Sequence, residues 1–144
     1  MREGRLLLLR RAIEPWRGTW DIPGGFCEAH EHPIETAVRE VREETGLDVR
    51  VTGFLGMWLD VYDDPHGRGD DKTITLNCYY HAVPVDPDPI PKLDRTEASD
   101  YAWFEPGDLP THIAFANHAT NVLAAWRDAF YAGTTDLPLP DRPD

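Results

Sequence analysis

The sequence has few cysteines, few positive charges and no long hydrophobic run. Its two cysteines, Cys27 and Cys78, are too few for a disulfide framework and favour a reducing, cytoplasmic setting. The longest run of leucines, residues 6–9, is far shorter than a membrane span or the apolar core of a signal peptide. Only 14 Lys and Arg stand against 26 Asp and Glu, and the net charge of −12 repels nucleic-acid backbones and acidic membrane surfaces. We therefore expect neither a membrane nor a nucleic-acid polymer as a partner.

Length and composition indicate one globular domain. The chain has 144 residues, of which 41% are hydrophobic and 28% charged, values typical of a folded chain with a single core. We assign this domain to residues 1–133. Residues 134–144 are rich in proline and aspartate, so we expect them to form a tail that frays.

Apolar or alternating patterns predict β-strands at residues 5–11, 49–61, 73–83 and 101–104. Gly53 and Gly56 break the second segment, which reads as one or two strands. The third segment alternates, and one of its sides carries Ile74, Leu76, Cys78 and Tyr80. Four prolines in residues 84–91 exclude a helix or a central strand there.

The first predicted strand follows a hairpin turn at Glu3-Gly4, and no strand precedes that turn in the sequence. Two explanations remain open. Either the first strand is missing, or the neighbouring edge is supplied by another segment or by a second subunit, which would make the protein a homodimer.

Helical patterns cover residues 34–45 and 117–131. Pro33 suits the first turn of the earlier helix, and Gly46 is placed to end it. The apolar stripe of this helix consists of Ile34, Ala37, Val38, Val41 and Thr45. In the later helix, apolar residues recur at helical spacing at Val122, Leu123, Trp126 and Phe130, with Gly133 just beyond.

Three glutamates, Glu40, Glu43 and Glu44, share a face of the first helix beside its apolar stripe. Like charges at this spacing destabilise a helix, so the cluster needs a counter-charge, which Arg39 and Arg42 can supply in part. The preceding Pro-Gly-Gly turn, residues 23–25, exposes its backbone to close approach. Carboxylates beside free carbonyls are the ligands that a hard divalent cation prefers.

The stretch from Gly25 to Leu47 resembles the Nudix box of the Nudix hydrolases. Gly25 is followed after five residues by Glu31, and after seven more by residues 39–47, which read Arg-Glu-Val-Arg-Glu-Glu-Thr-Gly-Leu and match at every specified position. Residues 20–25 before the box, and 103–106 and 109–110 after it, look like its common flanks. The resemblance covers residues 6–126.

The resemblance implies an α/β fold, a Nudix-type α/β/α sandwich around a mixed β-sheet. It also implies hydrolysis of a nucleoside diphosphate linked to another group, with Mg²⁺, or Mn²⁺ in its place. Glu43 and Glu44 would bind the metal, and Glu40 would bind metal or act as the general base. The carbonyl of Gly24 or Gly25 would complete the coordination and the corner would contact substrate.

Further residues have roles by the same resemblance. Arg39 would orient the glutamates through ion pairs, and Glu31 would support the site from behind. Glu97, on a later loop, is either a further base or a solvated side chain. Arg11 and Arg68 are candidate cations for substrate phosphates. The Gly- and Asp-rich loop that carries Arg68, residues 63–72, is either a lid over the substrate or a surface insertion.

Several residues have more than one interpretation. Cys27, His30 and His32 have the side chains of zinc ligands, but no fourth ligand is evident; the histidines otherwise contact a phosphate or are simply exposed. His30 stands where many relatives have glycine in a left-handed turn. The aromatic residues either stack on a nucleobase or belong to the core, with the core favoured for two of them; the set is Trp16, Trp20, Trp58 and Tyr62.

The substrate is not fixed by the sequence. ADP-ribose or a nucleotide sugar is favoured over an oxidised nucleoside triphosphate, and a third alternative is a module that senses ADP-ribose without cleaving it. Tyr62 and Pro65 lie near the positions at which relatives carry substrate signatures past the box, but neither has the matching spacing.

Overall fold

The leucine-rich run forms β1 (Leu6–Arg11), the central strand of a three-stranded sheet in the computed structural model, which describes residues 1–63 and 72–133. Left-handed backbone at Glu3 and Gly4 makes the predicted turn before it. β2 (Trp20–Asp21) pairs with one edge of β1 and β5 (Ala98–Phe104) with the other, both antiparallel. Another segment of the same chain therefore supplies the edge that the sequence left open.

The second sheet is a long antiparallel hairpin of β3 (Val49–Asp63) and β4 (Lys72–Pro84). Of the two alternatives for this segment, one strand or two, the structure shows one, which continues through both glycines with irregular register near Gly53 and Gly56. At Gly56 a Cβ atom would lie 2.8 Å from the Trp58 ring, so glycine lets that indole fold back against the strand. The glycines thus bend one strand and do not divide it.

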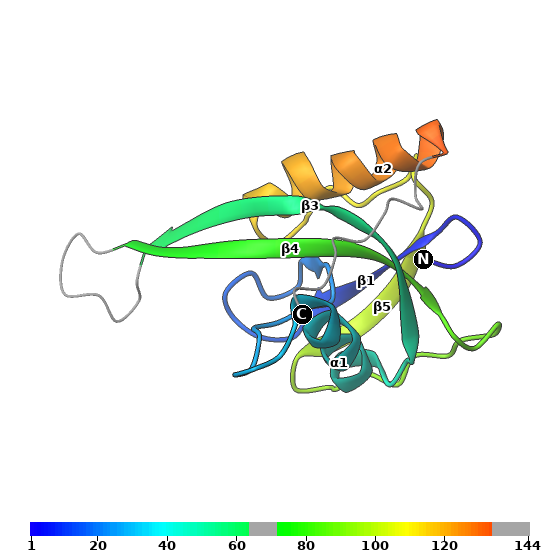
Figure 1. Ribbon diagram of the computed structural model, residues 1–144, viewed down its shortest axis with the longest axis horizontal. Coiled ribbons are helices and arrows are strands. Elements are labelled where there is room, and N and C mark those ends of the chain that lie inside the picture. The colour runs from blue at the N-terminus through cyan, green and yellow to red at the C-terminus, as the bar shows by residue number, and fades with distance from the viewer. Residues whose placement is uncertain (64–71, 134–144) are drawn as a thin grey trace.

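The outer part of this hairpin, residues 57–63 and 72–78, extends beyond the rest of the molecule, and we call it the arm (Figure 1). Its base is held by polar contacts. Asn117 donates to the carbonyl oxygen of Leu59 at 2.8 Å and to the buried carboxylate of Asp60, which also accepts from Asn77 at 2.5 Å. The tip, which includes most of the predicted lid with Pro65 and Arg68, lies outside the described residues, as do the tail 134–144 and the side chain of Tyr62.

The helices lie on opposite sides of the hairpin, with α1 (Pro33–Thr45) below it and α2 (Leu123–Ala132) above it in Figure 1. The predicted end of each helix is confirmed, because Gly46 and Gly133 both adopt the left-handed C-cap conformation. The predicted second helix begins as a π-helical turn, η1 (His118–Val122). Such turns occur frequently at functional sites.

The core lies between the two sheets and both helices, and the cluster of Leu7, Leu9, Leu47 and Ala98 packs against Val41 of α1. Its buried apolar side chains are those of Leu7, Leu8, Leu9, Leu47, Ala98, Ala114, Val122, Leu123 and Trp126. The α/β class is confirmed, and the strands that the structure describes form two antiparallel sheets. An isolated parallel bridge joins Trp20 of β2 to Ile113, which lies outside these strands. No helix among the described residues is both long and apolar enough to cross a membrane.

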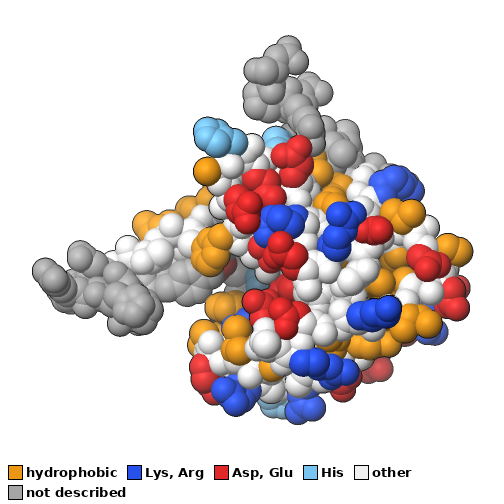
Figure 2. Space-filling view, turned by 90° about the horizontal axis from the view of Figure 1, so that it is seen from below, with side chains coloured by type: hydrophobic (Ala, Val, Ile, Leu, Met, Phe, Trp, Pro, Cys, Tyr) orange, Lys and Arg blue, Asp and Glu red, His pale blue; other side chains and the backbone are white. Residues whose placement is uncertain are grey.

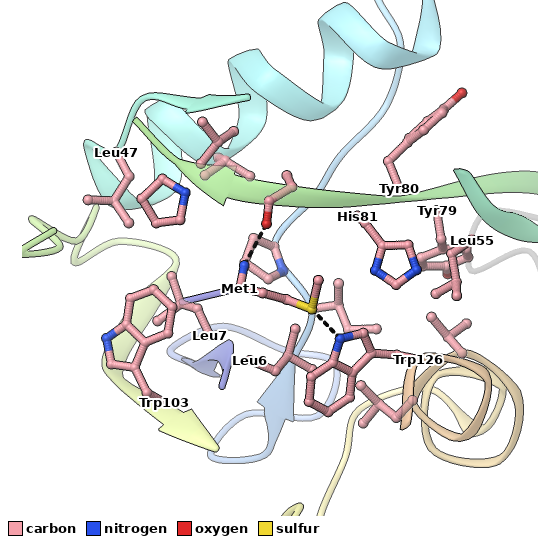
Figure 3. A pocket seen from close by; sticks show the side chains of 18 residues that line it. Met1, Leu6, Leu7, Leu47, Leu55, Tyr79, Tyr80, His81, Trp103 and Trp126 are labelled. Carbon is pink, nitrogen blue, oxygen red and sulfur yellow. Dashed lines mark hydrogen bonds between the residues drawn. The ribbon is translucent and has the colours of Figure 1, made fainter. Parts of the chain in front are cut away.

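An apolar cavity of about 120 Å³ remains in this core (Figure 3). Leu55 and Tyr79 from the hairpin, Trp103 from β5 and Trp126 from α2 contribute to its wall. Two of the aromatic residues considered for stacking pack against other rings nearby: Trp20 lies edge-on to Phe104 at 5.0 Å and Trp58 edge-on to Tyr79 at 5.5 Å. Both side chains are therefore partly buried, and neither belongs to the fully buried core that the sequence favoured for them. Trp16 is 53% exposed.

Candidate active site

The three glutamates sit on a helix that is fixed at both ends. At its N-terminus, Ile34 donates its backbone N–H to His32 Nδ1 at 3.2 Å, and Glu35 accepts from the His32 N–H at 3.0 Å, which forms a capping box. Pro33 occupies the first turn as predicted, and the Gly46 N–H donates to the Arg42 carbonyl at 2.8 Å. His32 is thus a helix cap.

The loop before the helix retains the left-handed turn, with a φ of 68° at His30. Histidine therefore adopts here the conformation that favours glycine. Among the residues that the structure describes, no three His, Cys, Asp or Glu side chains are grouped closely enough to hold a metal ion. This holds for the zinc set considered for Cys27, His30 and His32, and also for the three box glutamates in their present conformations.

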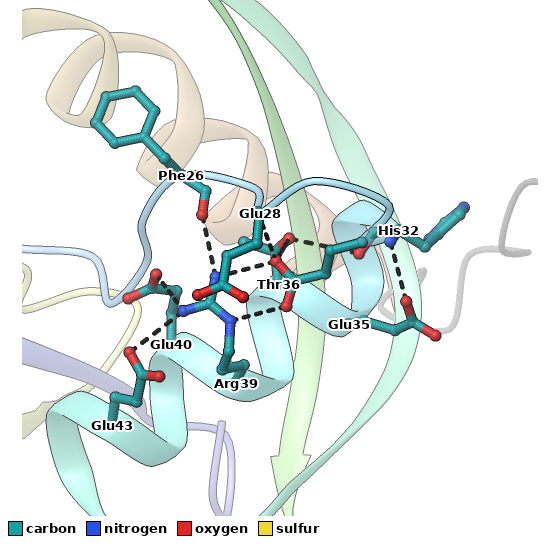
Figure 4. A network of polar contacts seen from close by, with 9 residues as sticks. Phe26, Glu28, His32, Glu35, Thr36, Arg39, Glu40 and Glu43 are labelled. Carbon is teal, nitrogen blue, oxygen red and sulfur yellow. Dashed lines mark hydrogen bonds and ion pairs between the residues drawn. The ribbon is translucent and has the colours of Figure 1, made fainter.

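Arg39 lies at the centre of the carboxylates (Figure 4). Its Nε and Nη2 donate to the two carboxylate oxygens of Glu31 at 2.7 and 3.0 Å, and Nη1 donates to Glu40 at 2.8 Å and Glu43 at 3.2 Å. Nη2 also reaches the carbonyl of Phe26 at 3.1 Å. These hydrogen bonds lower the pKa of Glu31 to about 2 and raise the pKa of Arg39. Arg39 therefore ties three box glutamates to the loop that follows the glycine corner.

The glycine corner, residues 23–25, lies directly against Glu44 and Glu40 of the helix. The backbone N–H of Gly24 donates to Glu44 Oε2 at 2.9 Å. A Cβ atom at Gly25 would lie 2.4 Å from the carboxyl carbon of Glu40, whereas at Gly24 it would meet nothing within 4 Å. The two glycines are therefore not equivalent: both approach a glutamate, but only at Gly25 would an added Cβ atom collide with one.

This difference gives a matched pair of variants. Gly25→Ala should displace the Glu40 carboxylate and lower kcat by roughly 100-fold, the cost of an ångström-scale misplacement of a reacting group, with little change in Tm because a flexible side-chain end yields. Gly24→Ala, with open space at its Cβ, should retain most of the activity. Steady-state kinetics and thermal unfolding of both variants check this; equal losses of activity would contradict it.

Glu44 has the most perturbed acidity of the box glutamates. Its pKa is raised to about 8, mainly by burial; the carboxylates of Glu97, Glu40 and Asp21 contribute to the rise, and the hydrogen bond from the Gly24 N–H opposes it. The structure thus brings Glu97 and Asp21 into the electrostatic environment of the box. The sequence analysis named Glu97 as a candidate site residue and did not name Asp21. The signal that could have indicated Asp21 was its position two residues before the Pro-Gly-Gly turn.

The pH dependence of stability should follow from this shift. Without metal, the unfolded chain loses the Glu44 proton near pH 4.5 and the folded chain keeps it until about pH 8. The folded state therefore binds more protons over this range, and its stability falls as pH rises, by on the order of 3–4 kcal/mol between pH 5 and pH 8. Chemical denaturation in EDTA at pH 5 and pH 8 should show a smaller fall for Glu44→Gln than for the parent protein. Parallel falls would be inconsistent with a buried, protonated Glu44.

Asp21 is also the centre of a second polar network, which sequence reasoning missed. Its carboxylate accepts from Arg11 Nη1 and pairs with His118 Nδ1, both at 2.8 Å, and it accepts from the Ile22 N–H. The other ring nitrogen of His118 lies 2.7 Å from the Tyr79 hydroxyl. Residues from β1, β2, β4 and η1 thus meet just before the glycine corner and fix its approach.

Arg11, a predicted substrate ligand, takes part in this network through its Nη1. Its Nε donates to the Pro15 carbonyl at 2.8 Å, and its guanidinium lies over the Phe115 ring at 5.3 Å. The side chain is 17% exposed. Arg11 therefore contributes to the fold around Asp21, and its role toward a substrate phosphate stays a prediction; Arg68, the other predicted cation, lies outside the described residues.

The donor chemistry of the box suits a hard divalent cation. Figure 2 shows acidic side chains gathered with arginines in the middle of the face that carries α1. Glu40 and Glu44 offer carboxylate oxygens beside the glycine backbone, and the pKa of Glu44 is raised first by burial and then by neighbouring carboxylates, two costs of its charge that a bound cation would offset. Arg39 holds Glu40 and Glu43 in ion pairs, so coordination would require these side chains to turn from the arginine.

Comparison with known proteins agrees with this site. The family model described as NUDIX domain matches residues 1–126. An ADP-ribose pyrophosphatase of Methanocaldococcus jannaschii is 39% identical over 67 residues, 46% of this chain and 40% of that protein. A Mycobacterium tuberculosis protein named "Putative 8-oxo-dGTP diphosphatase 3" is 36% identical over 121 residues, 77% of this chain and 50% of the relative. The chain thus spans half or less of the length of these curated relatives.

The fold also has solved counterparts. The crystal structure of a NUDIX hydrolase from Nitrosomonas europaea superposes with a TM-score of 0.68 at 26% identity, covering 96% of this chain and 69% of the other. The family model covers most of the described residues, including both networks of the site. The chain therefore belongs to the Nudix hydrolase family.

Proposed function

We propose that this protein hydrolyses the pyrophosphate bond of a nucleoside diphosphate linked to another group, with Mg²⁺ or Mn²⁺ as cofactor. The observation that carries this proposal is the packing of Glu40 and Glu44 against the glycine corner, with the pKa of Glu44 raised to about 8. Without a cation, an acidic, half-buried cluster next to bare backbone would repel the negative charge of a diphosphate. It suits a cation that bridges carboxylates and phosphates.

Glu40, Glu43 and Glu44 would hold the cation, together with the carbonyl oxygen of Gly25. When bound, a divalent cation neutralises the diphosphate, polarises the phosphorus centre and lowers the pKa of water. Glu40, 15% exposed and kept in place by Gly25 and Arg39, is suited to accept the proton of the attacking water. Glu97 is exposed and near Glu44, so it is a second candidate for the same proton.

Arg39 and Glu31 position the glutamates. The two parallel hydrogen bonds between them fix the guanidinium plane, and the remaining donors of Arg39 then set the directions of Glu40 and Glu43. Arg39 therefore acts on the reaction through the carboxylates that it orients. The glycine corner leaves room beside Glu44 for a phosphate to approach.

ADP-ribose or a nucleotide sugar is the substrate class that we favour, and the name of the M. jannaschii relative supports ADP-ribose. The second candidate is an oxidised nucleoside triphosphate, which the name of the M. tuberculosis relative supports over a larger part of the chain. We further propose that residues 1–133 act as a single domain on a small nucleotide in the cytoplasm; the cysteines, Cys27 and Cys78, are both free thiols.

The test is a panel of ADP-ribose, nucleotide sugars and 8-oxo-dGTP with Mg²⁺ or Mn²⁺ in ¹⁸O-labelled water. We expect cleavage between the two phosphorus atoms of a diphosphate compound, with one label in one product and none after EDTA. Cleavage of 8-oxo-dGTP alone would replace the favoured substrate by the second candidate. Tight binding of ADP-ribose without release of any product would favour the sensing module.

A further inference from the structure

The arm has one apolar face that points into solvent. Along β3 and β4 its exposed side chains alternate with half-buried ones, as strand geometry requires. Five large apolar side chains are more than half exposed there: Met57 56%, Leu59 61%, Val61 61%, Ile74 64% and Leu76 61%. The strand register places Leu59 opposite Leu76 and Val61 opposite Ile74, so these side chains form one continuous ladder. We call it the arm face.

The opposite side of the arm is already covered. Asp60, only 8% exposed, is bonded to Asn117 and Asn77, and Asn117 also binds the Leu59 carbonyl, so this side is turned toward η1. These contacts fix the orientation of the base of the arm. The arm face therefore cannot be turned inward without breaking a buried polar network. In Figure 2, hydrophobic side chains of the arm are visible between the grey end of the arm and the acidic side chains in the middle of the view.

We propose that the arm face is the docking surface for a second copy of this chain, with the two arm faces stacked against each other. An isologous contact of this kind needs a surface complementary to itself, and a ladder of similar aliphatic side chains on a two-stranded sheet has that property. Two sheets stack face to face at about 10 Å, with their side chains interdigitated. The proposal concerns assembly and is independent of the substrate.

The area and the charge both favour a second copy. The five side chains offer on the order of 450 Å² of apolar surface, so two copies would bury roughly 900 Å² from them alone, near the ~1,000 Å² at which specific interfaces begin. The chain carries a net charge of −12, which drives copies apart over most of the surface. None of the five side chains of the arm face is charged, so contact between these side chains carries no charge repulsion of its own.

The experiment measures the mass of the purified full-length chain by light scattering and sedimentation velocity over a hundredfold range of concentration. We expect a dimer for the parent protein. Leu59→Lys and Leu76→Lys each place two lysines in the symmetric contact and should raise the dimer dissociation constant by at least about 100-fold. Leu76→Thr, which preserves strand propensity, should give a smaller shift in the same direction. Circular dichroism and Tm verify that the variants are folded.

Ile90→Lys is the matched control, because Ile90 is 71% exposed but lies in the proline-rich connection after β4, away from the arm. It should remain dimeric. A monomeric parent protein at every concentration overturns the proposal, whether the arm face is then covered by residues 134–144 or by another protein. A dimer that Leu59→Lys, Leu76→Lys and Ile90→Lys leave equally intact overturns it as well. Substrate cleavage is measured separately, so failure of the proposed activity would not be confused with failure of the dimer.

Discussion

Replacing Glu44 with glutamine should lower kcat/KM by more than about 100-fold, since even groups that only support metal ligands are worth 10–100-fold in activity. The isosteric amide can still accept the hydrogen bond from the Gly24 N–H, so the corner should keep its shape. What it removes is the negative charge that the cation requires. The measurement is steady-state cleavage of the substrate that the panel identifies, with the concentration of Mg²⁺ varied.

The matched control for this variant is Glu14→Gln, which makes the same change of charge at a side chain 72% exposed, in a loose pair with Arg17. It should leave kcat/KM and the dependence on Mg²⁺ unchanged. Glu44→Gln should also shift the dependence on Mg²⁺ to higher concentrations. Full activity of Glu44→Gln with unchanged dependence on Mg²⁺ would remove Glu44 from the proposed cation site.

Replacing Arg39 with alanine should have the second large effect, on both activity and stability. Arg39 is 23% exposed and makes ion pairs with three box glutamates, so its loss leaves these carboxylates close together without their counter-charge. The pKa of Glu31 should then rise from about 2 toward its ordinary value, while the Glu28 N–H and the Thr36 hydroxyl continue to lower it. We expect a lower Tm and a fall in kcat of roughly 100-fold, because Glu40 loses its orientation.

Two further variants make this test specific. Arg42→Ala removes another arginine from the same helix, one that is 62% exposed and pairs with Asp48 at the surface, and it should change activity little. Arg39→Lys keeps the charge but cannot form the two parallel hydrogen bonds to Glu31, so it should restore Tm more than kcat. If Arg42→Ala and Arg39→Ala were equally impaired, a positioning role for Arg39 would be untenable.

Local features of the sequence were enough to predict the helix that carries the box. Pro33 and Gly46 predicted its ends, and the structure confirms α1 at Pro33–Thr45. Of the predicted apolar stripe only Thr45 is buried, and Thr36, which the stripe did not include, is the other buried residue of the helix. The turn at Glu3-Gly4, the buried β1 and the buried side of α2 were predicted for the same reason. Each of these depends on residues within a few positions of one another, where backbone preference and periodicity decide the outcome.

The continuity of β3 could not be predicted in the same way. Gly53 and Gly56 interrupt the strand pattern locally, and it is pairing with β4 along the whole length that keeps β3 in one piece. The sequence also placed Ile74 and Leu76 on one side of β4, which is correct, but alternation cannot show whether another element covers that side. Here it is exposed, since η1 contacts the opposite side of the arm.

The sequence by itself determined the family, the fold class and the spacing that gathers Glu40, Glu43 and Glu44 on one helical face, because these follow from local order along the chain. Only the tertiary structure decided which of these glutamates is buried against the glycine corner, that Asp21 and Glu97 raise the pKa of Glu44, and that Arg11 is bound to Asp21. Those properties depend on solvent exclusion and on charges brought together from distant segments, and both exist only after the sheets and helices have packed.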